Sequence, residues 1–384
     1  MLTDPTSHTP TPSRSHRKER RLWHDEARNP PCIGCSGCPE RALCGGLRLE
    51  LRSFDCLDFC CKNPSGCDRV CRNNPDFVDR VREIGSFDLA EVPRASVPPP
   101  TPELPPVVPM IFHGSARAAR VSPPAAALSL YQMLDRRTGE PRHASHEALC
   151  AAYGIAPGTP LLLTGTGRDR PLERWWGIGG ARRRAVIRAA RTAGAVAATT
   201  PNFSLFLDRP RWDDLHAMAR IAIVHWEFLD EGLPAALHVN GRTEADFQRW
   251  AAFLAERLEI TLLAYEFATG TGWAGRRERH AAWLAGLARG VGRPLAIVVR
   301  GGADVLPALA GAFARTTVLD TNVFMKTVMR QRAISAGDGA PPTWRSAPTP
   351  LGAPLDGLLA ENLAAVEGWL GRSGPERRKR GRAA

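Results

Sequence analysis

The sequence lacks an apolar run long enough to cross a membrane. No stretch approaches the roughly 18 consecutive apolar residues of a transmembrane helix. The first 21 residues, MLTDPTSHTPTPSRSHRKERR, contain no apolar core of a secretory signal. We therefore expect a cytoplasmic protein with no membrane contact. Thiols stay reduced in that compartment, so cysteines that lie close together indicate metal binding rather than disulfides.

The common nucleotide-binding loops are also missing. No GxGxxG opens a helix, no GxxxxGK[ST] occurs, and the glycine-rich segment 165–180 has neither spacing. Trp175 and Trp176 precede a run of arginines at 182–184, and these residue types can stack on a base and hold phosphate. We favour the simpler interpretation, in which the tryptophans pack in the core and the arginines form a solvated helix face.

Cysteine is nearly absent from most of the chain and crowded into one part of it. Of ten cysteines, only Cys150 lies outside the segment 32–71. An odd number of clustered cysteines in a reducing compartment predicts metal ligands. The nine candidates are Cys32, Cys35, Cys38, Cys44, Cys56, Cys60, Cys61, Cys67 and Cys71.

The first group has the spacing C-x2-C-x2-C at Cys32, Cys35 and Cys38, with Pro39 directly after it. Three cysteines in this spacing hold iron–sulfur clusters together with a fourth from elsewhere, and Cys44 is the natural fourth ligand. The resemblance to bacterial ferredoxins is partial, because no cysteine follows three residues further on. We predict an iron–sulfur cluster, of the 4Fe-4S type, with zinc as the alternative.

The second group pairs Cys56 with Cys60 and Cys67 with Cys71, and Cys61 is left over. Each C-x3-C pair can lie on one face of a helical turn, so two pairs could hold one zinc or a further cluster. The radical pattern C-x3-C-x2-C is absent, because Cys60 is followed directly by Cys61. No histidine occurs among these cysteines.

Shifts in composition divide the chain into segments. Residues 93–109 carry eight prolines, which exclude a helix or a central strand and favour an extended chain. We expect a disordered basic N-terminus, a cysteine-rich metal-binding module, a proline-rich linker, a barrel-like domain, and a last part with a linker, a short helix and a basic tail. In this order, the five segments are residues 1–28, 29–92, 93–106, 107–334 and 335–384.

Between the two linkers, short apolar runs alternate with helical stretches. Each run is bounded by glycine, proline or polar residues, as buried parallel strands are. Seven such strand–helix units predict an α/β fold, with a parallel (βα) barrel as the first choice and an open doubly wound sheet as the second. The expected strands lie within 107–112, 161–167, 195–200, 235–240, 260–266, 294–299 and 316–320.

The segment 201–254 resembles a family of phage and bacterial proteins classed as a domain of unknown function. That family shows a PDFSLY-D-P strand exit and then a helix with an aromatic residue near its end. The resemblance implies an α/β domain in a phage or mobile-element context and no known activity. The sequence departs from the family at 238–242, HVNGR, where a proline and a tryptophan are more common. The matching residues are Pro201, Asn202, Phe203, Ser204, Leu205, Asp208, Pro210, Trp226, Gly232 and Leu233.

Polar residues follow the expected strands, and ligands of parallel α/β folds bind at these carboxyl ends. We predict Glu266 or Asp320 as general base, His238 as acid or base, and Arg300 as the holder of an anionic group. Each of these residues is also compatible with a simple turn or helix cap. Asn202 and Asn240 are the expected cofactor-binding residues. Thr164, Thr166 and Asn322 have similar positions, whereas His225 and Glu227 are expected at a helix end or on the surface.

The charge distribution bears on possible partners. The net charge is +12, and the last fourteen residues hold six Lys or Arg against one Glu. Such a tail gives non-specific affinity for nucleic acid. Two functions therefore stay open. One is a metal-cluster enzyme whose barrel acts on a nucleotide or nucleic acid, and the alternative is a non-catalytic, zinc-dependent nucleic-acid-binding or adaptor protein.

Overall fold

The chain is described as two compact units. The smaller contains residues up to Pro93 together with Phe203–Ile223 and Asn240–Glu256, and the larger contains the other residues. The computed structural model describes the backbone at 47–49 and 52–54, and then residues 83–85, 87–135, 137–143, 145–205, 211–268, 275–337, 340–350 and 352–373.

The larger unit is built around a sheet of eight strands, which run in the order β3-β10-β9-β8-β7-β6-β5-β4. Every neighbouring pair is parallel. The α/β class and the parallel sheet predicted from the sequence are confirmed. The strands are β3 Val107–Pro109, β4 Ala126–Ser129, β5 Leu161–Thr164, β6 Ala195–Thr199, β7 Ala235–His238, β8 Leu262–Glu266, β9 Ala296–Arg300 and β10 Arg315–Asp320.

The two edges of this sheet meet. Strand β3 pairs with β10 along its length, from Val318 opposite Val107 onward. Directly after β3, Met110 forms a parallel bridge with Ala127 of β4, and the Ile111 amide donates to the Ala127 carbonyl at 2.9 Å. The sheet is therefore a nearly closed barrel, which leaves few unpaired backbone groups at its edges.

Alternate residues of the strands fill the inside of the barrel, as the period of two along a strand requires. Many of them are small, and they form one buried cluster: Val108, Met110, Ala125, Ala127, Leu162, Ala197, Ala236, Leu262, Ala264, Val298 and Leu319. The cluster is closely packed, so the interior is a core rather than a channel.

The proline-rich segment contacts the amino ends of the strands. Residues 94–106 form neither helix nor strand. Leu104 packs against the barrel core, and the Thr101 hydroxyl lies 2.6 Å from the Thr261 hydroxyl, directly before β8. Glu103 pairs with Arg315, the first residue of β10, at 3.1 Å. Leu104 therefore packs at the amino-terminal end of the barrel, opposite the carboxyl ends where ligands of such folds bind.

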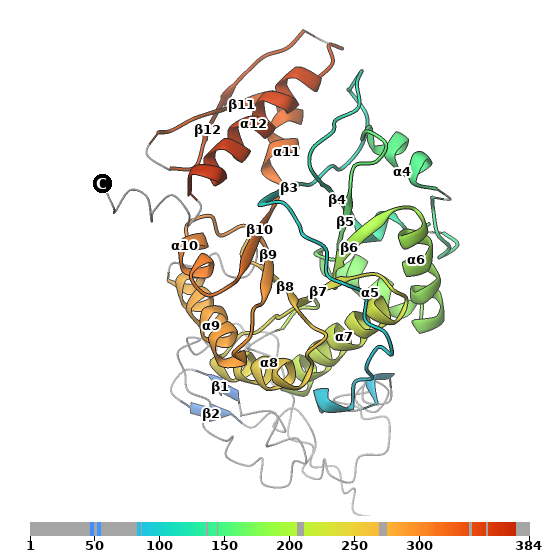
Figure 1. The fold of residues 1–384 in the computed structure, drawn as a ribbon, viewed down its shortest axis with the longest axis vertical. Coiled ribbons are helices and arrows are strands. Elements are labelled where there is room, and N and C mark those ends of the chain that lie inside the picture. The colour runs from blue at the N-terminus through green and yellow to red at the C-terminus, as the bar shows by residue number, and fades with distance from the viewer. Residues whose placement is uncertain are drawn as a thin grey trace, which may run out of the picture. The chain divides into compact units, whose positions relative to one another are not determined.

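Helices connect most of the strands, and Figure 1 shows α6, α9 and α10 on the outside of the sheet. Helix α7 begins in the smaller unit and ends in the larger one, and α8 lies in the smaller unit. The helices before the C-terminal part are α4 His146–Tyr153, α5 Asp169–Gly177, α6 Gly180–Thr192, α7 Arg211–Asp230, α8 Glu244–Glu256, α9 Arg276–Val291, α10 Leu306–Ala310 and α11 Asn322–Val328; the short 3-10 turn η5 is Leu130–Gln132.

The connection between β3 and β4, residues 110–125, contains no helix. The last helix among the described residues, α12 Asp356–Ser373, covers this part of the barrel instead. Its apolar side chains pack with outward residues of β3 and β10 and with α11 in one cluster. The members of this C-terminal cluster are Val107, Val323, Leu359, Val366, Trp369 and Leu370, with Val121, Leu306, Val318, Trp344 and Leu363 at its margin.

Two local expectations were wrong. Strand β4, Ala126–Ser129, lies where no strand was expected. The stretch 335–354 was expected to be loose, yet Thr343–Ser346 forms β12, which pairs antiparallel with β11 Gln331–Ile334. The buried Asn362 of α12 accepts from the Ala333 amide at 2.7 Å, so the helix supports this hairpin.

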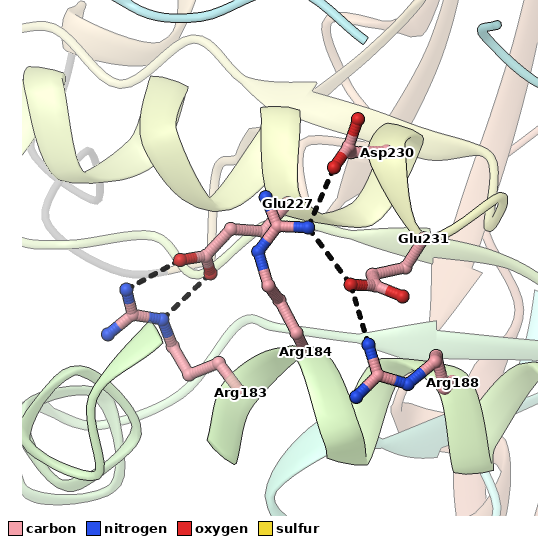
Figure 2. Close-up of polar contacts among 6 residues, drawn as sticks. All are labelled: Arg183, Arg184, Arg188, Glu227, Asp230 and Glu231. Carbon is pink, nitrogen blue, oxygen red and sulfur yellow. Dashed lines mark hydrogen bonds and ion pairs between the residues drawn. The ribbon is translucent and has the colours of Figure 1, made fainter. Parts of the chain in front are cut away.

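Arginines of α6 pair with acidic residues at the end of α7 (Figure 2). Arg183, which is 4 % exposed, makes a two-pronged ion pair with Glu227 at 2.7 and 2.8 Å. Arg184 contacts both Asp230 and Glu231 at 2.7 and 2.9 Å. Trp175 is fully buried, as favoured from the sequence. Glu227 lies in the last turn of α7, at the helix end expected for it, and it is buried there because it neutralises the Arg183 guanidinium.

The smaller unit contains the hairpin of β1 Leu47–Leu49 and β2 Arg52–Phe54, the short turn η4 Leu89–Glu91, the beginning of α7, and α8. Within it the guanidinium of Arg220 lies over the Phe203 ring at 4.0 Å, and both residues are buried. The nine clustered cysteines lie outside the described residues, so the metal-binding module stays a prediction.

Candidate active site at the carboxyl ends of the strands

Glu266 and Arg300 form an ion pair at the ends of neighbouring strands. The two residues stand opposite each other in the register of β8 and β9. Arg300 Nη1 donates to Glu266 Oε2 at 2.9 Å, and Glu266 Oε1 accepts from the Ala268 amide at 2.6 Å. The Glu266 side chain is 5 % exposed and that of Arg300 is 27 % exposed. The pair therefore fixes the guanidinium while part of it still reaches solvent.

His238 ends strand β7 and lies deeper. It is 1 % exposed, and it stands opposite Ala264, a member of the barrel core. Its Nδ1 is buried and has no hydrogen-bond partner among the described residues. Burial, and secondarily the charge of Arg300, lowers the pKa of His238 to about 3. The imidazole is therefore neutral at physiological pH and carries an unused hydrogen-bonding nitrogen.

Asp320 ends strand β10 and turns toward the helix that follows. Its Oδ1 accepts from the Val323 amide at 2.7 Å, so the carboxyl caps the start of α11. Burial raises the pKa of the Asp320 carboxyl, and amide hydrogen bonds from Val323 and Asn322 oppose that rise. The residue has a structural role as a cap, and its raised pKa also suits a group that exchanges protons.

Asn202 holds the loop after β5. Its side-chain oxygen accepts from the Gly167 amide at 3.0 Å. The Gly165 amide donates to the Thr199 hydroxyl at 3.0 Å, and the Tyr131 hydroxyl donates to the Gly165 carbonyl. The predicted cofactor-binding oxygen of Asn202 is thus used to fix a neighbouring loop. Tyr131 was not anticipated, and its signal would have been an aromatic residue two positions after the unrecognised strand β4.

Asn240 belongs to the smaller unit, two residues beyond the end of β7. Its side-chain amide donates to the Phe203 carbonyl at 2.8 Å, and its own carbonyl accepts from the Trp250 indole at 2.8 Å. These contacts give Asn240 a role in fixing the loop before α8.

Two glycines support the position of Arg300. Gly301 and Gly302 follow it directly, with φ of 74° and 69°, a backbone conformation that favours glycine. A Cβ at 301 would lie 2.7 Å from the Ala268 nitrogen, and one at 302 would lie 2.8 Å from the Phe267 ring. The loop after β9 can therefore pack directly on the loop that holds Glu266.

A buried tyrosine–histidine pair borders the site. The Tyr265 ring is stacked beside the His238 ring, with centroids 6.3 Å apart. The Tyr265 hydroxyl is hydrogen bonded to His280 of α9, which is completely buried. Sequence reasoning missed Tyr265 and His280, because their contact joins a strand to a helix.

Two other histidines of the larger unit, His225 and His146, have structural partners. His225 lies late in α7, close to the helix end expected for it, and is 3 % exposed rather than on the surface. Its Nε2 is 3.0 Å from the Ala235 carbonyl, and burial lowers its pKa to about 4. His146 lies 3.4 Å from the buried Cys150 thiol, and burial raises the pKa of that thiol. No group of three or more potential metal ligands occurs among the described residues.

The arrangement at the carboxyl ends of β7, β8 and β9 combines three chemical properties. Arg300 offers a positive charge that a neighbouring carboxylate orients, His238 offers a neutral imidazole with an unpaired nitrogen, and Asp320 on β10 offers a carboxyl group with a raised pKa. Burial lowers the pKa of His238 and raises that of Asp320, and in both residues it favours the neutral form. Of the four predicted catalytic residues, Glu266 and Arg300 are in contact, and His238 is close enough to feel the charge of Arg300.

Comparison with known proteins gives little beyond this geometry. No protein-family model and no curated protein matches the sequence. No helix among the described residues is long and apolar enough to span a membrane. Among solved structures, the chain is similar to a protein described as "putative lyase/mutase from Burkholderia cenocepacia J2315", with 18% identity and a TM-score of 0.33, over 68% of this chain and 90% of that chain.

Proposed function

We propose that the barrel is an enzyme domain whose substrate binds at the carboxyl ends of β7, β8 and β9. The substrate carries an anionic group, and a nucleotide or nucleic acid is the class favoured by the net charge of +12. The observation that carries the proposal is the buried His238, whose Nδ1 has no partner among the described residues. An unpaired buried nitrogen costs stability, so its retention favours a role toward a ligand.

Each residue has a distinct role in this proposal. Arg300 binds the anionic group, and Glu266 orients the guanidinium through the 2.9 Å ion pair. His238 forms a hydrogen bond with the substrate through Nδ1, because its imidazole is neutral and this nitrogen has no other partner among the described residues. Asp320 exchanges a proton with the substrate, because burial raises the pKa of its carboxyl.

The cysteine-rich module is proposed to hold the metal centre. Its nine cysteines are proposed to bind an iron–sulfur cluster, with zinc as the alternative, and the resemblance of 201–254 suggests a phage or mobile-element context. A protein purified without oxygen should show broad absorption near about 400 nm if iron–sulfur is present. A colourless protein with stoichiometric zinc would show that the module binds zinc instead of an iron–sulfur cluster. A protein with neither metal would contradict the proposal that the module binds a metal.

The proposed site is tested by binding of adenosine monophosphate and inorganic phosphate to the full chain, measured by isothermal titration calorimetry. We expect binding to be lost in the double variant Arg300→Gln/Glu266→Gln, which removes both charges and so avoids an uncompensated buried charge. The control is Arg183→Gln/Glu227→Gln, which neutralises a buried Arg–Glu pair away from the proposed site. Equal binding by both double variants would place the anion elsewhere and reject the proposed site.

The second candidate function is non-catalytic nucleic-acid binding through the C-terminal tail. The six basic residues among the last fourteen favour it. Binding of a single-stranded oligonucleotide should then weaken steeply with salt, and deleting residues 372–384 should remove both the affinity and the salt dependence. Binding that keeps its salt slope without the tail excludes the tail as the contact.

A further inference from the structure

Two unpaired nitrogens lie at two levels of the barrel. His238 Nδ1 and Arg300 Nε are both buried, and neither has a hydrogen-bond partner among the described residues. His238 stands level with Ala264, whereas Arg300 stands level with Glu266, two residues further along β8. Two residues of a strand span about 6–7 Å. A ligand that uses both nitrogens must therefore present two polar groups separated by several bonds.

The two levels differ in charge and exposure. The outer level holds the Arg300 cation, whose side chain is 27 % exposed, so an anion can reach it from solvent. The inner level holds His238, which is 1 % exposed and neutral, because burial disfavours its charged form. A buried neutral imidazole suits an uncharged partner such as a hydroxyl group, because a second charge at this depth would have to be desolvated.

The barrel below His238 limits the length of such a ligand. Ala236 and Leu262 lie further down the interior and are 0 and 3 % exposed in the packed core cluster, and Ala264 and Val298 of the same cluster stand level with His238. A ligand can therefore extend no deeper than the level of His238. Its uncharged part has to be short, and it has to offer a hydroxyl group to His238 Nδ1.

We propose that this site binds the phosphate ester of a small sugar or polyol, with the phosphate at Arg300 and a hydroxyl group at His238 Nδ1. The inference rests on the proposed function, because it uses the same site, and it names the part of the substrate that is recognised. A dianionic phosphate has three acceptor oxygens, so it can accept from Arg300 while the bond to Glu266 is kept. In a pentose 5-phosphate, several bonds separate the phosphate group from the hydroxyl groups, as the distance between the two levels requires.

The test compares two phosphate esters that differ in their hydroxyl groups. Ribose 5-phosphate and n-butyl phosphate are titrated into the full chain by isothermal titration calorimetry, with inorganic phosphate as the reference for the anion alone. We expect ribose 5-phosphate to bind about tenfold more tightly than n-butyl phosphate, because only its hydroxyls can satisfy the buried nitrogen. Inorganic phosphate should resemble n-butyl phosphate.

Two matched variants assign the preference to His238. In His238→Phe an aromatic ring remains but the ring nitrogens are lost. The tenfold preference for ribose 5-phosphate should therefore disappear while n-butyl phosphate still binds. The control His225→Phe makes the same change at a buried histidine beside Ala235, at the opposite end of β7, and the preference should persist. Circular dichroism of both variants establishes that they are folded, and His238→Gln, which keeps a polar side chain, should restore part of the preference.

The outcomes separate this inference from the proposed function. If both esters bind equally through Arg300, the phosphate site stands and the sugar-phosphate assignment is rejected. A preference that survives His238→Phe also rejects it. If none of the three probes binds at millimolar concentration, the anion site and the inference fall together.

Discussion

At the scale of single residues, the barrel buries several polar groups, some of them neutral histidines and some of them nitrogens without a hydrogen-bond partner. His225 and His238 are buried and neutral, and the two nitrogens at His238 and Arg300 are unpaired among the described residues. His225 has an evident structural reason, since it contacts the Ala235 carbonyl. His238 Nδ1 has none within the described part of the chain, a property that it shares with other buried atoms such as His143 Nε2 and Trp175 Nε1. What sets His238 apart is its place at the carboxyl end of β7, close enough to Arg300 for the charge of Arg300 to lower its pKa.

The lowered pKa values predict how stability depends on pH. Burial holds the pKa of His238 at about 3 in the folded state, against about 6.5 when unfolded. Between these values only the unfolded chain takes up the proton, so stability falls as the pH drops below about 6.5. Because of His238, the free energy of unfolding should be about 2 kcal/mol lower at pH 5 than at pH 8. Urea unfolding at both pH values should show this loss in the wild type and a smaller loss in His238→Phe.

The comparison between variants is needed because other groups titrate as well. The Asp320 carboxyl has a raised pKa, so it acts in the opposite direction and favours the folded state at lower pH. Both proteins carry this contribution, and it cancels in the difference. An identical pH dependence in wild type and His238→Phe would show that His238 is protonated in the folded state.

Gly301 should be sensitive to a single methyl group. Ala at this position would need a φ near 74° and would bring its Cβ to 2.7 Å from the Ala268 nitrogen. We expect Gly301→Ala to destabilise by about 1–3 kcal/mol and to weaken phosphate binding, because Arg300 precedes it. Gly286→Ala in α9 is the control, since open space surrounds it and the helix should gain up to about 1 kcal/mol. Urea midpoints of the two variants should move in opposite directions.

At the scale of elements, the sequence predicted the strands that are apolar and bounded by turn residues. Glu266 and Arg300 could be placed together because both end such strands in a parallel sheet. Strand β4 escaped prediction because Ala126 and Ala127 lack the bulk and β-branching that mark strands, and its pairing with β5 decides its conformation. The pairing of Glu227 with a residue 44 positions away could not be read from the chain either.

The ion pair between Arg183 of α6 and Glu227 of α7 should contribute more to stability than the exposed ion pairs around it. Arg183 and Glu227 have side chains that are 5 % and 3 % exposed. Glu227→Ala leaves a buried guanidinium without its countercharge and should cost roughly 3–5 kcal/mol. Arg188→Ala removes an arginine that is 54 % exposed and should cost less than about 1 kcal/mol. Thermal and urea unfolding of the two variants measure the difference, and equal losses would contradict the buried character of the first pair.

At the scale of the whole molecule, the larger unit depends on segments that are distant in the sequence. The barrel closes through β3, which pairs with β10 and bridges β4. The outer side of β3 is covered by α12, because the connection from β3 to β4 provides no helix. The cysteine-rich module precedes this unit in the sequence, so the proposed metal centre and the proposed barrel site can be changed separately by mutation.

The C-terminal helix should therefore be indispensable for the barrel. A chain that ends at residue 354 lacks α12 and exposes Val107, Val318 and Val323. We expect it to lose cooperative thermal unfolding, because burial of several large apolar side chains is removed together. A chain that ends at residue 373 keeps the helix and lacks only the tail, so its midpoint should match that of the full protein. Trp369→Ala, which empties one position of the C-terminal cluster, should cost about 3–5 kcal/mol. Cooperative unfolding at an unchanged midpoint of the chain that ends at residue 354 would show that the barrel does not need α12 for its stability.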